Sequence, residues 1–149
     1  MNNITGTITK DFSYHEFERS AKADELGIRN VINTFAIRDA VKALVETVLQ
    51  PLRCAWEKPL TINSGYRCPE LNKNIKGSSP TSQHVKGEAA DIITGSEEES
   101  YRLASLAKEL GLPYDQMILY PTFVHFSHKL DGRQRGQILY NKSYKGERL

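Results

Sequence analysis

The stretch AADIITGSEEESYRLASLAKELG, residues 89–111, decides the fold class, because a short apolar run is followed at once by a helix with marked ends. AADII, residues 89–93, is typical of a buried strand. Ser96, followed three residues later by Glu99, is a capping box that begins a helix, and Gly111 ends that helix. The stretch therefore predicts a buried strand that leads directly into an amphipathic helix.

The segments after this stretch predict further strands. QMILY (116–120) and FVHFSHK (123–129) are separated only by Pro121-Thr122, which predicts a tight antiparallel hairpin. RGQILYN, residues 135–141, predicts one more strand.

Helices dominate the first half of the chain. From Thr34 onward, apolar residues recur mostly at spacings of three and four and predict a long helix, in which Pro51 should cause a kink or a break. Ser13 can cap a short helix, with Glu16 at the capping-box position, and a second short helix is expected before Gly27.

Short elements are expected between the long helix and residue 89. LTIN (60–63) predicts a strand, Pro69 can start a helical turn that runs to Ile75, and GSSPTS (77–82) predicts a loop. Helices first and strands late favour an α+β fold, with N-terminal helices packed on a small antiparallel sheet. We interpret residues 1–149 as a single domain, with residues 1–11 extended or frayed.

Composition limits the possible functions. A net charge of +2 excludes a strongly basic nucleic-acid binder. The N-terminus lacks a secretory signal, and no apolar run reaches the roughly 18 residues of a membrane span, so we expect cytoplasmic synthesis. Cys54 and Cys68 lack the spacing of a metal site and are expected to be reduced.

Three segments carry residues suited to metal chemistry. SQHVKGEAAD (82–91) supplies His84 and Asp91, and a carboxylate in an apolar strand costs several kcal/mol unless it is paired or binds a metal. His125 lies opposite the apolar side of its predicted strand, and Arg67 follows a glycine-containing turn. Taken alone, His125 would more often be only hydrogen-bonded and Arg67 a surface ion pair, so a metal site and a structural interpretation both stay open.

The string S-x-H-x-x-G-x-A-x-D in 82–91 resembles the signature of the zinc D-Ala-D-Ala carboxypeptidase family (metallopeptidase family 15, subfamily A), which includes phage endolysins. Further segments follow the family's order from about Phe12 to about Tyr140: FSYHEFERS, LQPLR, SGYRCPELN, YDQMIL and FVHFS. The resemblance implies a hedgehog/D-Ala-D-Ala peptidase-like arrangement.

Position by position, the resemblance implies that His84, Asp91 and His125 bind one zinc ion. Three protein ligands leave a coordination position open for water, which is the catalytic pattern of zinc. Arg67 would hold the substrate's carbonyl or carboxylate, Ser82 would support the ligand loop, and the resemblance also places Gln83 at the substrate.

The sequence departs from the family's pattern at the positions where the family carries its general base. Family members carry a carboxylate three residues before the last ligand, where this chain has Thr122, or at the end of the preceding strand, where it has Tyr120. A two-residue hairpin loop pairs Ile118 with His125 and places Gln116, Ile118 and Tyr120 on the face of His125.

Candidates for the base are then Glu88, Asp115 and His128, whereas Tyr120 could instead donate a hydrogen bond to the oxyanion. The structural alternatives are that Tyr120 only caps the hairpin and that Asp115 only caps a strand.

Two functions follow as hypotheses. The first is a monomeric zinc peptidase that cuts peptidoglycan stem peptides, as a carboxypeptidase or endopeptidase, and reaches the wall once released, in the manner of a phage or prophage lysis protein. The second is a catalytically weak or inactive zinc-binding module for wall recognition or a virion. A generic α+β domain without metal is the third interpretation.

Overall fold

The structure is a computed structural model that describes residues 6–149. Its centre is a five-stranded sheet in the order β3-β4-β6-β5-β7. The strands are β3 (Ile62–Ser64), β4 (Ala89–Ile93), β5 (Gln116–Leu119), β6 (Phe123–Ser127) and β7 (Gln137–Tyr140). The α+β class is confirmed, but the expectation of a purely antiparallel sheet is wrong at one edge. There β7 pairs with β5 in parallel, because the chain returns along the sheet before β7 begins.

The hairpin of β5 and β6 has the predicted register. Ile118 pairs with His125, and the backbone N–H of Tyr120 donates to the carbonyl oxygen of Phe123 at 2.9 Å. On its other side β6 pairs with β4, which sets Asp91 directly opposite His125. This cross-strand pairing brings together two residues that are 34 positions apart in the sequence.

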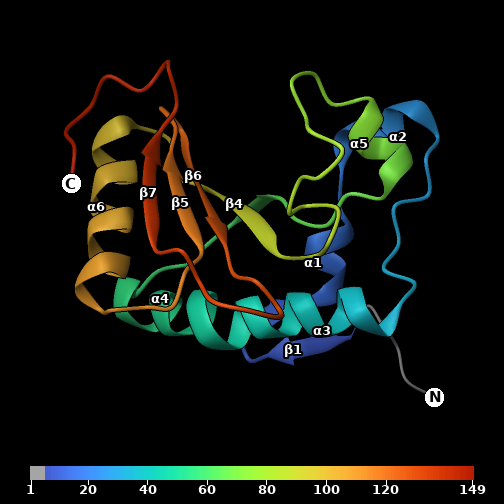
Figure 1. Cartoon of the computed structure of the whole chain (residues 1–149), viewed down its shortest axis with the longest axis horizontal. Coiled ribbons are helices and arrows are strands. Elements are labelled where there is room, and N and C mark those ends of the chain that lie inside the picture. Colours follow the sequence, from blue (N-terminus) through green and yellow to red (C-terminus); the bar gives the residue numbers. More distant parts are fainter. Residues whose placement is uncertain (1–5) are drawn as a thin grey trace.

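A single long helical run lies beneath both halves of the molecule (Figure 1). It consists of α3 (Phe35–Leu44), a π-helical turn η1 (Val45–Leu49) and α4 (Gln50–Trp56). The break or kink expected at Pro51 takes the form of this π-helical turn, which ends just before the proline. Proline lacks the N–H that an α-helix requires, and the wider turn lets the run continue.

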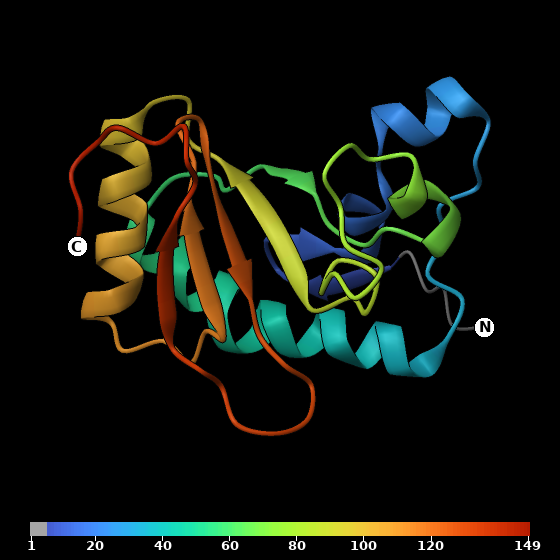
Figure 2. The ribbon, with the colours of Figure 1, turned by 45° about the horizontal axis from the view of Figure 1, so that its top comes forward.

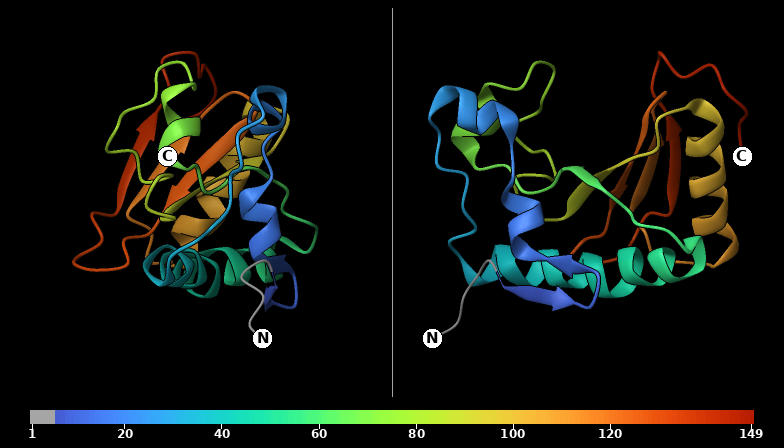
Figure 3. Two further views of the ribbon diagram at one scale, coloured as in Figure 1. Left: turned by 90° about the vertical axis from the view of Figure 1, so that its right-hand side faces the viewer. Right: turned by 180° about the vertical axis from the view of Figure 1, so that it is seen from behind.

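The remaining helices flank the sheet in two groups (Figures 1 and 2). The helix α6 (Glu97–Glu109) covers the sheet on one side and begins where predicted, with Ser96 Oγ accepting from the N–H of Glu99 at 3.1 Å. Near the other end of the long helical run lie α1 (Tyr14–Glu18), α2 (Ala21–Leu26) and α5 (Pro69–Lys73). The view from behind in Figure 3 shows β4 running between these two groups.

The N-terminal segment differs in part from expectation. The prediction for residues 1–5 lies outside the described residues, whereas Thr7–Thr9 form β1, which pairs with β2 (Phe12–Ser13). This segment is extended, as predicted, but paired rather than frayed. The predicted capping box of α1 is present, since the N–H of Ser13 donates to Glu16 Oε1 at 2.9 Å.

The core lies between the long helical run and the sheet. It includes fully buried Leu44 and Leu49 from the helices and Val124 and Phe126 from β6. Since Val124 and Phe126 point into the core, the alternate residue His125 points to the opposite face of the sheet. Both cysteines are free. No helix within residues 6–149 has the length and apolar character needed to cross a bilayer.

Candidate metal centre

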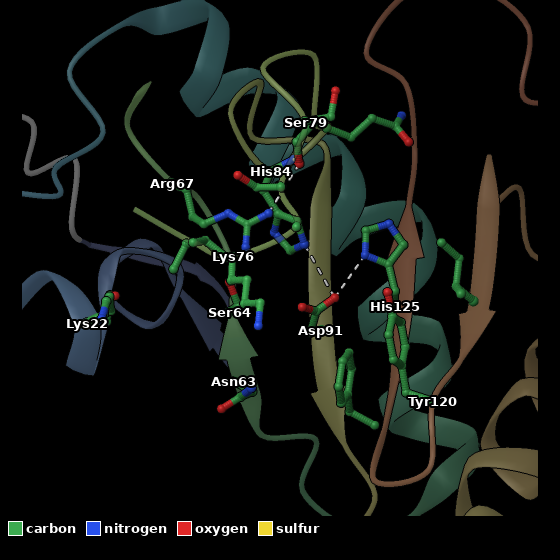
Figure 4. A pocket seen from close by; sticks show the side chains of 18 of the residues that line it. Lys22, Asn63, Ser64, Arg67, Lys76, Ser79, His84, Asp91, Tyr120 and His125 are labelled. Atoms are coloured by element: carbon green, nitrogen blue, oxygen red, sulfur yellow. Dashed lines mark hydrogen bonds and ion pairs between the residues drawn. The ribbon is translucent and has the colours of Figure 1, made fainter. Parts of the chain in front are cut away.

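The ligand atoms of His84, Asp91 and His125 all lie within 4.8 Å of one another. Asp91 Oδ1 lies 3.4 Å from Nε2 of His84 and 2.9 Å from Nδ1 of His125 (Figure 4). His84 and Asp91 are only 3% and 9% exposed, so the protein shields most of the cluster from solvent. The structure thus brings together the three residues predicted as metal ligands.

The orientation of His84 is set by a backbone carbonyl. Nδ1 of His84 lies 2.7 Å from the oxygen of Gly65. A carbonyl oxygen can only accept, so Nδ1 carries a proton, and Nε2 is the ring nitrogen turned toward Asp91. Metal-binding histidines commonly have their second nitrogen held in this way.

The Asp91 carboxyl is held ionised by its neighbours. Burial alone raises its pKa, but the electrostatic attraction of His84 and the hydrogen bond from His125 outweigh burial and keep the pKa well below its ordinary range. A buried, ionised carboxylate between two imidazoles is a donor set that suits zinc.

The geometry also fits a tetrahedral metal. Zinc ligands at about 2.0–2.1 Å from the ion lie roughly 3.3 Å from one another, and Asp91 Oδ1 lies 3.4 Å from Nε2 of His84 and 2.9 Å from Nδ1 of His125. The residues present therefore fit a zinc ion held by three protein ligands.

Gly87 allows the ligand segment to fold back between His84 and Asp91. Its φ of +75° lies in the left-handed region, and a Cβ at this position would come within 2.8 Å of the carbonyl oxygen of Ile37. Both conditions require glycine. The bend inferred from the sequence at this position is confirmed.

The cluster opens into a cavity of about 680 Å³. The cavity also reaches Arg67, Ser82, Gln83 and Tyr120 among the predicted site residues. Of the described residues that line it, Asp91 is the sole carboxylate, whereas its cations are Lys22, Arg67, Lys76 and Arg135.

Arg67 is tied to the ligand loop through Ser82. Nη2 of Arg67 donates to Ser82 Oγ at 3.3 Å, and the same oxygen accepts from the N–H of His84 at 3.2 Å. Nε of Arg67 is buried without a hydrogen-bond partner among the described residues. Burial lowers the pKa of Arg67, although nearby Asp91 opposes that shift. Apart from the contact with Ser82, no hydrogen bond of the terminal guanidinium N–H groups is found within residues 6–149, so Arg67 has donor capacity left for a ligand in the cavity.

Gln83 lines the cavity, but its amide is engaged elsewhere. Nε2 donates to Glu88 Oε1 and to Asp115 Oδ2, each at 3.2 Å. The Gln83 side chain therefore connects the loop that carries His84 to Glu88, which is half-buried, and to Asp115, which is buried.

Asp115 lies outside the lining of the cavity and is fully buried. Arg135 forms a bidentate ion pair with the Asp115 carboxylate. Nη2 of Arg135 lies 2.6 Å from Oδ2, and Nε lies 3.1 Å from Oδ1. Burial by itself raises the pKa of Asp115, but the hydrogen bonds and charge of Arg135 lower it below the ordinary value. The alternative interpretation, a residue that secures the start of β5, fits this placement better than a general base does.

The other candidates for the base also lie outside the cavity's lining. Glu88 accepts from Gln83 and from the N–H of Leu130, and Nδ1 of His128 lies 2.7 Å from the carbonyl oxygen of Pro113. These contacts engage both side chains away from the metal ligands.

Tyr120 is placed on the cavity wall beside the cluster (Figure 4). Its ring stacks on Phe123 with centroids 4.1 Å apart, which fixes its direction. Burial raises the pKa of its hydroxyl, with a smaller contribution from Asp91, so the hydroxyl remains a proton donor at neutral pH.

Two residues that position the site were not predicted from the sequence. Gly65 supplies the carbonyl that orients His84, and Asn30 holds the backbone on both sides of Arg67. Neither shows a motif, because a carbonyl acceptor exists at every position and a buried asparagine is recognised only from its partners. The cations of the cavity other than Arg67 were missed for a similar reason, since surface lysines and arginines are common.

Comparison with known proteins shows similarity to peptidases. A family model described as Peptidase M15 matches residues 10–127, which include Arg67 and all three candidate ligands. A zinc D-Ala-D-Ala carboxypeptidase of Streptomyces albus G is 44% identical over 50 residues. That stretch is 33% of this chain and 19% of the other protein, so the likeness spans about a fifth of the relative's length.

Proposed function

The chain belongs to the peptidase M15 family, and from this premise we propose that it is a zinc metallopeptidase that hydrolyses a peptide bond in bacterial peptidoglycan stem peptides. The observation that carries the proposal is the convergence of two imidazoles and one buried carboxylate at a cavity that also contains Arg67. The similarity to a zinc D-Ala-D-Ala carboxypeptidase supports both the metal and the substrate class.

In this proposal His84, Asp91 and His125 hold one zinc ion. When bound there, zinc supplies a water of lowered pKa and polarises the scissile carbonyl. The hydrogen bond from His84 to Gly65 and the pairing of β4 with β6 keep the three side chains in place before substrate arrives.

Arg67 and Tyr120 act on the substrate. The guanidinium of Arg67 binds the substrate's carbonyl oxygen or terminal carboxylate, and Ser82 orients that guanidinium. The hydroxyl of Tyr120 donates to the carbonyl oxygen as that oxygen gains negative charge. We assign Asp115, with Gln83, to the support of the ligand loop.

Hydrolysis is expected to be slow. A general base takes a proton from the attacking water, and its loss typically lowers the rate by about 10²–10⁴-fold. Apart from Asp91, which is committed to the metal, no described residue lining the cavity carries a carboxylate.

Purified peptidoglycan sacculi test the proposal directly. Zinc-loaded protein should release D-alanine or reduce the number of crosslinks, and both chelator and His84→Ala should abolish the reaction. The absence of any zinc-dependent product after long incubation would reject the peptidase function. Which product forms would distinguish a carboxypeptidase from an endopeptidase, and lysis of added cells would support an endolysin-like role.

A second possible function is wall binding without cleavage. One observation favours it: among the described residues that line the cavity, no carboxylate other than Asp91 is present. In that case the zinc-loaded protein would sediment with sacculi and leave their peptides intact. Turnover that disappears in His84→Ala would exclude it. The single domain, the hedgehog-like arrangement and the monomeric state remain part of the proposal, and light scattering tests the last of these.

A further inference from the structure

The cavity has two chemically different sides. Lys22, Arg67 and Lys76 come from α2 and from the segments that follow β3 and α5, and Figure 4 shows all three on one side of Asp91. The opposite side is formed by the β5–β6 hairpin with Ile118, Tyr120 and Phe123. These three side chains are uncharged at neutral pH.

The cations on the first side are poorly neutralised. Within residues 6–149, Arg67 and Lys76 form no ion pair, and Lys22 has only an exposed pair with Glu25 at 3.5 Å. Exposed pairs of this kind contribute little. Arg135, the remaining cation of the lining, is in contrast neutralised by its bidentate contact with Asp115.

Polar side chains accompany these cations. Asn63 and Ser64 from β3, and Ser78 and Ser79 from the segment after α5, line the same cavity. Amide and hydroxyl donors beside cations suit carboxylate oxygens. A cleft lined by charges of one sign also concentrates ligands of the opposite sign.

One substrate carboxylate at Arg67 leaves both lysines without an anionic partner among the described residues that line the cavity. We infer that Lys22 and Lys76 form a second anion-binding subsite, which selects peptides that carry another carboxylate on the Arg67 side of the scissile bond. This inference rests on the proposed peptidase function and adds to it a substrate class, acidic peptides with two negative charges on that side.

Two matched peptides test the subsite with zinc-loaded full-length protein. Dansyl-D-Ala-D-Glu and dansyl-D-Ala-D-Gln share the terminal carboxylate and differ only in a side-chain carboxylate or amide. We expect the acid to show about fivefold higher kcat/KM and about fivefold tighter binding in a fluorescence titration. Both ratios should fall as salt is raised, because exposed charges are screened.

Variants assign the effect to the lysines. In the double variant Lys22→Ala/Lys76→Ala, the acid-to-amide ratios of kcat/KM and of affinity should both approach one. Lys73→Ala, which removes an exposed cation on α5 that does not line this cavity, should keep the wild-type ratios. Equal binding of the two peptides by the wild type, or an unchanged ratio in the double variant, would overturn the subsite.

The two proposals fail in different ways. Tighter binding of the acid, with no cleavage of either peptide and no zinc-dependent product from sacculi, would reject the peptidase function and support the subsite. Cleavage of both peptides at equal kcat/KM with equal affinity would reject the subsite and support the peptidase function.

Discussion

His84 Nδ1 lies 2.7 Å from the carbonyl oxygen of Gly65, so the turn before Arg67 also orients a candidate metal ligand. The same turn continues to Arg67, whose N–H donates to the carbonyl oxygen of His84 at 3.1 Å. The two segments therefore hold each other through reciprocal contacts. This coupling makes the metal site sensitive to changes that do not touch a ligand.

Gly65→Ala should weaken zinc binding. A Cβ at position 65 would lie 2.7 Å from the Cα of Phe17, so the backbone must move, and we expect the Gly65 carbonyl to shift away from His84. Loss of such an outer contact typically lowers metal affinity by about 10–100-fold. Competition with a chromophoric chelator measures the affinity, and circular dichroism checks that the variant is folded. A folded variant with wild-type affinity would contradict the role of this carbonyl.

Asn30→Ala should impair Arg67 while leaving the metal bound. Asn30 donates to the carbonyl oxygen of Tyr66 at 2.8 Å and accepts from the N–H of Cys68 at 2.7 Å. Removing these contacts lets the Arg67 backbone shift, and a displacement of about 1 Å can cost as much as 10²-fold in rate. We expect a fall of about tenfold in kcat/KM with unchanged zinc stoichiometry. Loss of zinc in step with activity would instead indicate a general structural role.

Tyr120→Phe should lower kcat by at least about tenfold with little change in KM, because the lost hydroxyl serves mainly the transition state. The ring and its stacking on Phe123 are retained, so the variant isolates the hydroxyl. Steady-state kinetics on a dansylated D-Ala-D-Ala peptide measure the effect. An unchanged kcat would leave Tyr120 with only a structural role.

Tyr120→Glu should raise kcat if the missing carboxylate limits the rate. Position 120 lines the cavity on the face of His125, whereas Thr122 is exposed in the turn. We expect an increase of about tenfold or more at neutral pH. Tyr120→Gln serves as the matched control, since glutamine has nearly the size of glutamate and no charge. Equal kcat values for the two variants would show that a carboxylate here does not act as the base.

Asp115→Asn should destabilise the fold by about 1–3 kcal/mol at pH 7, because it weakens the contact with Arg135. The pKa of Asp115 is lowered in the folded state, so its contribution is present above the unfolded value near pH ~4. That contribution is lost as the pH falls through the lower, folded pKa. Urea unfolding of both proteins should show a difference that shrinks in acid. A difference that does not depend on pH would argue against the ion pair.

Local patterns in the sequence predicted most helices and strands and the candidate ligand set. Ser96 and Glu99 mark the start of α6, and the two-residue spacing at Pro121-Thr122 sets the register that pairs Ile118 with His125. These features depend on neighbours in the chain, whose geometry a pattern can predict.

The way in which distant segments meet is visible only in the folded chain. Folding set Asp91 opposite His125, turned β7 parallel to β5, and placed Asp115 against Arg135 instead of in the cavity. These outcomes follow from packing between segments far apart in the chain, and burial then fixes which polar groups can pair. A carboxylate next to a strand looks the same in sequence whether it faces a substrate or a buried arginine.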